Sequence, residues 1–454
     1  MNPKCRYPRA TIDSAYFAIW VSPIVIHHSP NFTLFFRPAS RLTVGVRPPK
    51  KFRPEPFAYH HELTLHIDSL TNLGMGVARV DGWVVFVPYC LPGETVLARI
   101  YRNEKNFSQA DLVEVLKPSP DRVAPQCSLF TECGGCQYQH FSYSAQLAWK
   151  TRQVEELMKH MAGHTFSVKP CHPSPQQLGY RSKITPHYQK PRSAEEFMPI
   201  GFLAQGRRSQ ILDVPQCPIA MKEINAALPA VRETTRKNPR KKGGTLLLRA
   251  TVDHDNTRHV TTDNNAVVTE VCGTTRFDFL AGEFFQNNPF ILEEFVGYVA
   301  QQTRLPEIQF LIDAYCGSGL FALCLAPHFQ QVAGVEVSEA AVEWARKNAE
   351  KNAITNATFL AASAEAIFEG ITFPSKNTTV VIDPPRKGCT PEFLDQLIAF
   401  APRRVVYVSC DPATQVRDLA ILLAAGFTLT AVQPFDLFPH TRHVENIMTF
   451  DGPV

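Results

Sequence analysis

The sequence has no long uninterrupted run of apolar residues. Its most apolar N-terminal piece, Ala15 to Ile26, is broken by Ser22 and Pro23 and falls short of the roughly 20 residues that a bilayer-spanning helix needs. No small-residue cleavage site follows this piece closely, which makes it a poor signal peptide. We therefore expect a protein that binds no membrane.

A strong excess of charge of one sign is also missing. The formal net charge is +4 and the charged residues make up 19% of the chain, as in an ordinary soluble globular protein. Charge alone therefore names no partner. The basic run from Arg236 to Lys242 is the exception, since clustered cations can bind a polyanion, although such a run is commonly a solvated loop.

The cysteines do not form the dense framework of a small secreted domain. Twelve of them are scattered through 454 residues. Such usage is typical of a reducing compartment, and we expect a cytoplasmic protein in which some thiols bind metal or act in catalysis.

The length suggests roughly three domains. Residues 1–58 hold prolines and scattered basic residues with no sustained period, and we predict a poorly ordered basic extension. Residues 59–120 contain short β-branched runs separated by glycine and proline, which predict a small antiparallel, OB-like β-barrel. Residues 121–283 show mixed strand-like runs and helical spacing, typical of an α+β domain.

Residues 284–454 follow a different sequence pattern, in which apolar strands alternate with helical stretches. That alternation predicts a Rossmann-like α/β domain with a parallel sheet and helices on both faces. Gly317 and Gly319 follow a strand and open a helix, so that a ligand can approach the backbone N–H groups. Glu336, at the end of the next strand, could hold a ribose, and both NAD and S-adenosylmethionine fit this pattern.

Residues at two further strand ends help to separate the NAD reading from the S-adenosylmethionine reading. Asp383 begins an Asp-Pro-Pro-Arg segment whose prolines stiffen a backbone that can face a planar base, although a plain turn would look the same. Cys410 ends a β-branched run and precedes Asp411 and Pro412, so it should lie where a strand opens onto a cleft. Together these features favour a methyltransferase that acts on carbon.

Such chemistry has a physical rationale for uracil. Carbon 5 is a poor nucleophile, and a thiolate that adds to carbon 6 makes it enolate-like. A free thiol has a pKa of about 8.5, so a neighbouring cation or hydrogen-bond donor is expected beside Cys410. A base must then remove the carbon-5 proton. Glu445, close to His440 and His443, is the candidate, although these residues could equally cap a final strand.

The motif DPPRKG, then sixteen residues, then VVYVSCDPAT and later FDLFPHTRHVE resembles the RNA uracil-5 methyltransferase family. The resemblance implies a class I methyltransferase fold that uses S-adenosylmethionine, with Cys410 as the nucleophile and Glu445 as the base. For the donor and uracil pockets it implies Gln286, Tyr315, Gly317, Gly319, Glu336 and Asp383.

Three positions depart from the family pattern. Asp411 stands where the family usually has Asn, and its charge would oppose thiolate formation unless it is paired or turned away. Leu320 stands where relatives often carry Asn, and Ser363 where a polar amide is common. Donor contacts at the last two positions are therefore not predicted.

Three cysteines lie within ten residues, at Cys127, Cys133 and Cys136. Four thiolates can hold zinc or a [4Fe–4S] cluster, and either Cys171 or Cys217 could complete the set. The family resemblance implies Cys217 and an iron–sulfur cluster of structural or RNA-positioning role, with zinc as the alternative.

The predicted barrel resembles the RNA-binding TRAM domain, so the resemblance covers nearly all of the chain after residue 58. A barrel together with a cysteine group favours 23S ribosomal RNA as the substrate, with a flipped-out target uridine. A transfer RNA T-loop enzyme is the nearest alternative. A non-catalytic RNA-binding or assembly protein is suggested only by Asp411, and a dinucleotide oxidoreductase would leave the DPPR and SCDP motifs unexplained. We expect a monomer.

Overall fold

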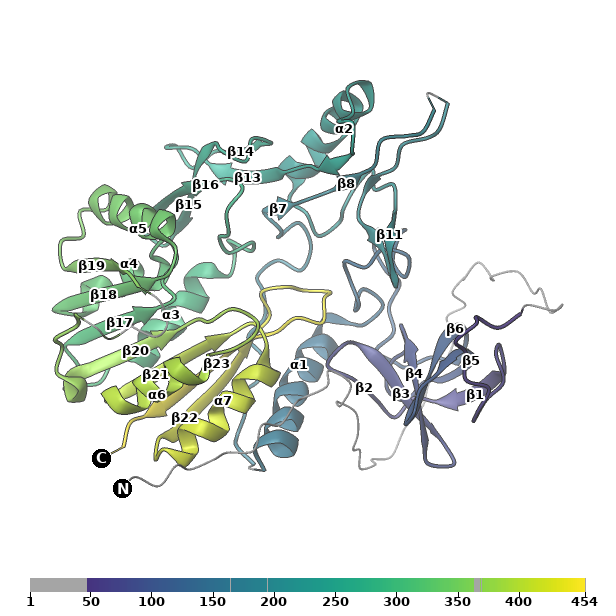
Figure 1. The fold of residues 1–454 in the computed structure, drawn as a ribbon, viewed down its shortest axis with the longest axis horizontal. Coiled ribbons are helices and arrows are strands. Elements are labelled where there is room, and N and C mark those ends of the chain that lie inside the picture. The colour runs from purple at the N-terminus through teal and green to yellow at the C-terminus, as the bar shows by residue number, and fades with distance from the viewer. Residues whose placement is uncertain (1–46, 164, 194, 363–367, 369, 454) are drawn as a thin grey trace. The chain divides into compact units, whose positions relative to one another are not determined.

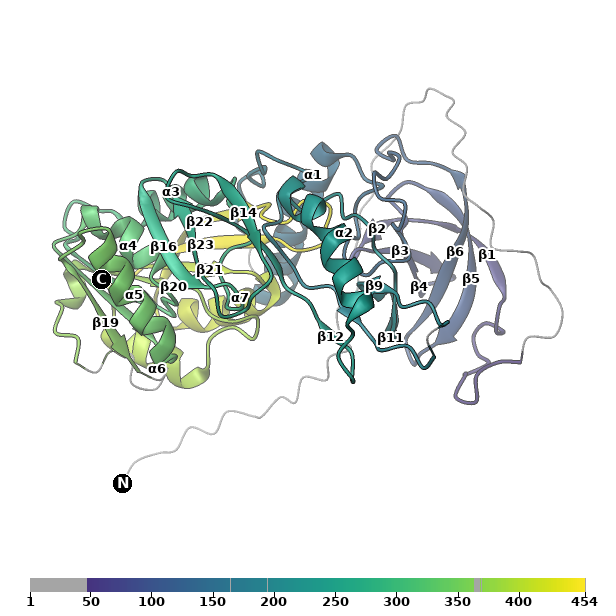
Figure 2. The same cartoon turned by 90° about the horizontal axis from the view of Figure 1, so that it is seen from above.

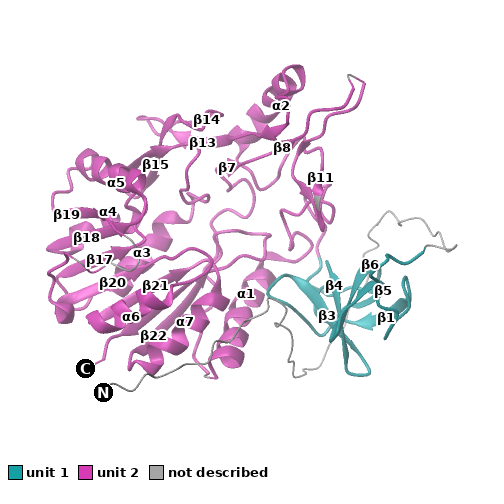
Figure 3. Ribbon diagram, in the orientation of Figure 1, with its two compact units in different colours: residues 1–122 teal, residues 123–454 magenta. Residues whose placement is uncertain are grey.

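The computed structural model describes residues 47–163, 165–193, 195–362, 368 and 370–453. Most of the predicted N-terminal extension, up to residue 46, lies outside these residues, as does Ser363. The chain forms two compact units, residues 1–122 and 123–454 (Figure 3). Among the described residues, no helix combines the length and the hydropathy needed to cross a membrane.

The first unit is a six-stranded β-sheet that wraps around its own apolar core. Along β5 every second residue from Val96 to Ile100 is buried, which is the alternation expected of a strand with one face turned inward. The sequence predicts an antiparallel barrel, but β4 and β6 pair in parallel. In the order β1-β5-β6-β4-β3-β2 the strands are Glu62–His66, Thr95–Asn103, Phe107–Lys117, Trp83–Pro88, Met75–Val80 and Ser69–Leu70.

The second unit begins with helix α1 (Tyr143–Leu157), which continues into the π-turn η1 (Met158–Ala162). Small sheets and helix α2 (Lys222–Lys237) follow (Figure 1). The strands are β7 (Lys183–Ile184), β8 (His187–Tyr188), β9 (Ile200–Gly201), β10 (Leu203–Ala204), β11 (Arg207–Ile211), β12 (Gly244–Thr245), β13 (Leu248–Val252), β14 (Arg258–Thr261), β15 (Val267–Cys272) and β16 (Thr275–Leu280).

The rest of this unit is built on a seven-stranded sheet in the order β19-β18-β17-β20-β21-β23-β22. The first five strands are parallel, and β23 is antiparallel to both of its neighbours. The strands are β17 (Phe310–Ala314), β18 (Gln331–Glu336), β19 (Ala357–Ala361), β20 (Thr378–Ile382), β21 (Arg404–Ser409), β22 (Thr428–Phe435) and β23 (Glu445–Asp451).

Helices cover both faces of this sheet, as the sequence predicts (Figure 2). Successive strand residues such as Val380 and Val381 point to opposite faces and join different apolar cores. One core includes α3 (Leu292–Thr303), α4 (Leu320–Leu325) and α5 (Glu339–Lys351), and the other includes α1, α6 (Pro391–Phe400) and α7 (Pro412–Ala424). Short 3₁₀ turns are η2 (Ala326–His328) and η4 (Ser375–Asn377).

The apolar core runs across the domain boundary expected at residue 284. Phe277 and Phe279 of β16 belong to the same core as α3, α4 and α5. The backbone N–H of Asp278 also donates to Asn348 Oδ1 of α5, at 2.7 Å. Earlier in the chain, Ile224 and Leu248 belong to a smaller core of their own.

The order of the strands reverses next to β17. From β17 the chain proceeds outward to β18 and β19, and then returns to β20 on the other side of β17. Ligands of open α/β sheets bind where the strand order reverses, at the carboxyl ends of the strands. Gly334 lets the turn after β17 pack closely, because a Cβ there would lie 3.0 Å from Cys316 Sγ and 2.5 Å from Phe359 Cδ1.

Candidate active site

The pairing of three neighbouring strands brings Cys410, Glu445 and Asp383 to this edge. Ser409 pairs with Asn446, so Cys410 at the end of β21 lies next to Glu445, the first residue of antiparallel β23. On the other side of β21, Tyr407 pairs with Ile382, which places Asp383 one strand away. All three are residues that the sequence singles out.

The surroundings of Cys410 favour its protonated thiol over the thiolate. Burial raises the pKa of Cys410 to about 12, and the carboxyl groups of Glu445 and Asp383 contribute to this rise. The Arg386 guanidinium acts in the opposite direction. The side chain is nevertheless only partly buried, so a ligand can reach it.

The two carboxyl groups have pKa values close to neutrality. Burial raises the pKa of Glu445 to about 8, with a further contribution from Asp383, while Arg386 lowers it. Burial also raises the pKa of Asp383 to about 7. A carboxylate with such a pKa is a stronger base than an exposed one and suits proton abstraction near neutral pH.

Asp411 is turned toward the start of helix α7. Its Oδ1 accepts hydrogen bonds from the backbone N–H groups of Ala413 at 3.1 Å and Thr414 at 3.4 Å, so it is the N-cap of the helix. Of the charges that act on the Cys410 thiol, that of Asp411 has the smallest effect. A carboxylate is also favoured at a helix N-terminus. Its presence in place of Asn is therefore compatible with a reactive cysteine.

The turn after β17 and the end of β18 form a second group of predicted residues. Tyr315, Gly317 and Gly319 all have positive φ angles, of 63°, 53° and 94°. Glu336 accepts hydrogen bonds from the backbone N–H groups of Gly317 at 3.2 Å and Ser338 at 3.0 Å. The carboxylate expected to hold a ribose thus lies directly against the glycine turn.

Sequence reasoning assigned no role to Asp313 and Val337, which lie at the same edge. Asp313 is fully buried, its Oδ2 accepts from Ala322 N at 2.7 Å, and its Oδ1 has no partner. Burial, together with Asp383 and Glu336, raises the pKa of Asp313 to about 8. Val337 is 72% exposed and offers an apolar surface beside Glu336. Such acidic groups suit a cationic ligand, and the valine suits a flat ring.

Leu320 begins helix α4 and is buried in the apolar core. It therefore offers no polar contact to a donor at the position where relatives often carry Asn. Gln286 is also buried, on the loop between β16 and α3, and its role in the pockets stays a prediction. Two residues earlier, Phe284 is 76% exposed, and this aromatic side chain was not predicted to act.

The four predicted metal-binding cysteines come together. Burial and the nearby sulfurs of Cys217, Cys133 and Cys127 raise the pKa of Cys136 to about 12. Gly135 N donates a hydrogen bond to Cys133 Sγ at 3.4 Å. Cys171, the other candidate for the fourth position, lies instead near Lys150 and Asp436.

The four thiols are donors that suit either a zinc ion or an iron–sulfur cluster. Backbone N–H groups directed at sulfur are typical of protein-bound iron–sulfur clusters. Around zinc, with bonds of about 2.3 Å, tetrahedral geometry would place the sulfurs roughly 3.8 Å apart. Among the described residues, no three of these cysteine sulfurs lie within 4.8 Å of one another.

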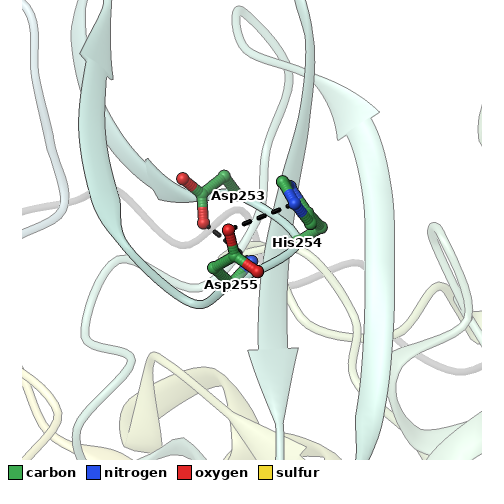
Figure 4. Close-up of side chains that lie close together, drawn as sticks. All are labelled: Asp253, His254 and Asp255. Carbon is green, nitrogen blue, oxygen red and sulfur yellow. Dashed lines mark hydrogen bonds and ion pairs between the residues drawn. The ribbon is translucent and has the colours of Figure 1, made fainter.

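One other group has metal-type side chains in close reach among the described residues. Asp253, His254 and Asp255 lie on the turn between β13 and β14 (Figure 4). Asp253 Oδ1 accepts from the backbone N–H groups of Asp255 and Thr257, both at 2.9 Å, so turn geometry accounts for the arrangement. We assign it no ligand.

Comparison with known proteins matches residues 254–450 to the tRNA (Uracil-5-)-methyltransferase family and residues 61–113 to the TRAM domain. The tRNA (uracil(54)-C(5))-methyltransferase of Schizosaccharomyces pombe is 40% identical over 416 residues, which cover 87% of this chain and 79% of the relative. The enzyme of the same name from Saccharomyces cerevisiae is 32% identical over 475 residues, 87% of this chain and 74% of the relative.

Among solved structures, the Pyrococcus abyssi tRNA (uracil-54, C5)-methyltransferase in complex with S-adenosyl-L-homocysteine has a similar fold. The TM-score is 0.66 at 23% identity, and the match covers 86% of this chain and 100% of that chain.

The charge of Glu445 should control the reactivity of the free thiol. At pH 9 the Glu445 carboxyl, whose pKa is about 8, is ionised and disfavours the Cys410 thiolate. Glu445→Gln removes this charge, so we expect its Cys410 to react several-fold faster with iodoacetamide at that pH. Mass spectrometry of the Cys410 peptide separates this thiol from the others. Glu350→Gln on the exposed side of α5 is the control, and equal rates in the two variants would contradict the expectation.

Proposed function

The chain belongs to the RNA uracil-5-methyltransferase family, and on that premise we propose that it methylates carbon 5 of uridine 54 in transfer RNA. The methyl donor is S-adenosylmethionine, bound at the carboxyl ends of β17, β18 and β20, where the strand order reverses. The observation that carries the proposal is the convergence of Cys410, Glu445 and Asp383 at the same edge.

The reaction follows from the roles of two residues. The Cys410 thiolate adds to carbon 6 of the uracil, and carbon 5 then attacks the methyl group of the sulfonium donor, releasing S-adenosylhomocysteine. Glu445 takes the proton from carbon 5, the bond between sulfur and carbon 6 breaks, and the thiolate is regenerated. Arg386 is the cation that favours the thiolate.

Transfer RNA is the better supported substrate. The two yeast relatives that align with 87% of this chain are named as tRNA (uracil(54)-C(5))-methyltransferases. The preference for 23S ribosomal RNA rests only on the presence of a TRAM domain together with a cysteine group, and neither yeast relative supports it. Ribosomal RNA therefore becomes the second candidate. We also propose a monomer in the cytoplasm, where thiols stay reduced, and all described cysteines are free.

Substrate positioning requires contacts to bases and phosphates. The exposed ring of Phe284 can stack on a base of a flipped or unpaired nucleotide. A basic ridge lies at the loops after β8 and α2, where exposed Phe197 has the Arg236 guanidinium 5.1 Å from its ring. The ridge consists of Lys190, Arg192, Arg236, Arg240, Lys241 and Lys242, which are exposed or partly exposed.

The four cysteines fit a [4Fe–4S] cluster better than zinc, because their sulfurs are spread more widely than a zinc ion needs. Such a cluster would supply a structural centre, since methyl transfer moves no net electrons. Cys127, Cys133, Cys136 and Cys217 would hold it.

Covalent trapping tests the substrate and both catalytic roles. With labelled S-adenosylmethionine and transfer RNA, Cys410→Ala should form neither adduct nor product, and Glu445→Gln should accumulate a methylated protein–RNA adduct. A transcript with cytidine at position 54 is the matched RNA control. Methylation of a 23S fragment together with no methylation of transfer RNA would reverse the choice of substrate.

Removing charge from the basic ridge should weaken RNA binding without changing chemistry. For Arg240→Gln/Lys241→Gln/Lys242→Gln we expect the Kd for transfer RNA to rise about tenfold. The slope of the logarithm of the binding constant against the logarithm of the salt concentration is negative. Its magnitude should decrease by about one for each phosphate that the variant no longer neutralises. The rate at saturating RNA should stay unchanged. Lys347→Gln on exposed α5 is the control. An unchanged Kd and salt slope would mean that the ridge is only solvated.

Anaerobic purification tests the metal group. We expect visible absorption and about four irons and four sulfides per chain. Cys217→Ser should lose most of the iron, and Cys171→Ser should retain it, because only Cys217 lies with the other three thiols. Stoichiometric zinc and a colourless protein would contradict the cluster.

A further inference from the structure

The loop that leads to Glu445 is long and largely buried. Residues 436–444, here called the base arm, join β22 to antiparallel β23. Loops between adjacent antiparallel strands usually have only two to five residues. All nine residues of the base arm are at least partly buried, although they form no regular secondary structure. Something other than strand pairing must therefore fix its course.

The centre of the base arm is His440, which has a left-handed φ of 64°. Its backbone N–H donates to Gln146 Oε1 of α1 at 3.0 Å. Its carbonyl accepts from the backbone N–H groups of Gln137 at 3.0 Å and Tyr138 at 2.9 Å. A residue that is not glycine keeps this conformation only when its surroundings hold it there.

The first half of the base arm has further attachments. Lys150 of α1 donates to Asp436 Oδ1 at 2.6 Å. The Asn288 amide donates to the carbonyl of Leu437 at 3.0 Å, and the Tyr180 hydroxyl donates to that of Pro439 at 3.0 Å. These bonds come from segments more than 100 residues away in sequence.

Gln137 links the second half of the base arm to the four-cysteine loop. Its Oε1 accepts from the backbone N–H of Arg442 at 3.2 Å, and its Nε2 donates to the carbonyl of Gly134 at 3.1 Å. Gly134 lies between Cys133 and Cys136, and Arg442 lies three residues before Glu445. Phe438, in the first half of the arm, packs against an apolar cluster of Cys136, Tyr180 and Ile219, and so does Cys217.

We infer that the four-cysteine loop sets the position of the catalytic base, and that Gln137 is the positioning residue that transmits it. The inference rests on the proposed role of Glu445. A base must lie within hydrogen-bond reach of the carbon-5 proton, and a displacement of about 1 Å can cost about 100-fold in rate. The Gln137 side chain bonds to backbone atoms of the two loops, so it should affect proton abstraction and leave thiolate addition and donor binding intact.

Rapid-quench kinetics with transfer RNA test this. In Gln137→Ala we expect the covalent adduct to form within about twofold of the wild-type rate and to decay at least about tenfold more slowly, with an unchanged KM for S-adenosylmethionine. Gln137→Glu should decay as slowly as Gln137→Ala, because its carboxylate still accepts from Arg442 N but cannot donate to the Gly134 carbonyl. Gln301→Ala, exposed on α3, is the matched control.

Parallel measurements on Glu445→Gln and of melting temperature separate the outcomes. If Glu445→Gln traps the adduct while Gln137→Ala releases product at the wild-type rate, the positioning role is wrong and the base assignment stands. If Glu445→Gln releases product normally, the proposed base itself is wrong. If Gln137→Ala melts earlier and slows adduct formation and decay equally, Gln137 supports the fold only, which overturns the inference. If Gln137→Glu releases product at the wild-type rate, the bond to Gly134 is not needed, which also overturns it.

Discussion

The antiparallel pairing of β21 with β23 is the constraint on which the site depends. A parallel strand delivers its last residue to the active edge, whereas an antiparallel strand delivers its first. Because Ser409 is opposite Asn446, the candidate nucleophile Cys410 and the candidate base Glu445 reach the same edge from strands of opposite direction. A one-residue shift in this register would turn one of the two side chains to the other face of the sheet.

This convergence has an electrostatic consequence. Cys410 shares its surroundings with two buried carboxyl groups, and Arg386 is the cation that opposes their effect on its pKa. A raised pKa favours the protonated form of this partly exposed thiol, which is less reactive than the thiolate toward oxidants and alkylating agents. In the proposed reaction, activation then has to accompany binding of the RNA, which replaces water around these groups with the uracil and the donor.

The sequence predicted which residues lie at the ends of the strands. It predicted less of the helix packing and long-range contacts that fix their positions. The runs before Asp313, Asp383 and Cys410 are apolar and end in turn residues, so the parallel sheet and its active edge could be predicted. The core that crosses residue 284 could not, since strand patterns do not reveal which helix covers them. The contact of Gln137 with Arg442 spans 305 residues and leaves no local signal.

The buried ion pair between Lys150 and Asp436 fixes the geometry of the base arm more than it adds to the stability of the fold. Lys150 and Asp436 have fully buried side chains, 2.6 Å apart, and Lys150 Nζ also donates to the carbonyl of Phe438 at 3.3 Å. A well-packed apolar pair would stabilise the fold as well, whereas a buried charge that loses its partner costs about 3–5 kcal/mol. A displacement of the base arm that separated Lys150 from Asp436 would therefore destabilise the fold by that amount. We therefore interpret the pair as selecting the one arrangement in which Glu445 lies beside Cys410.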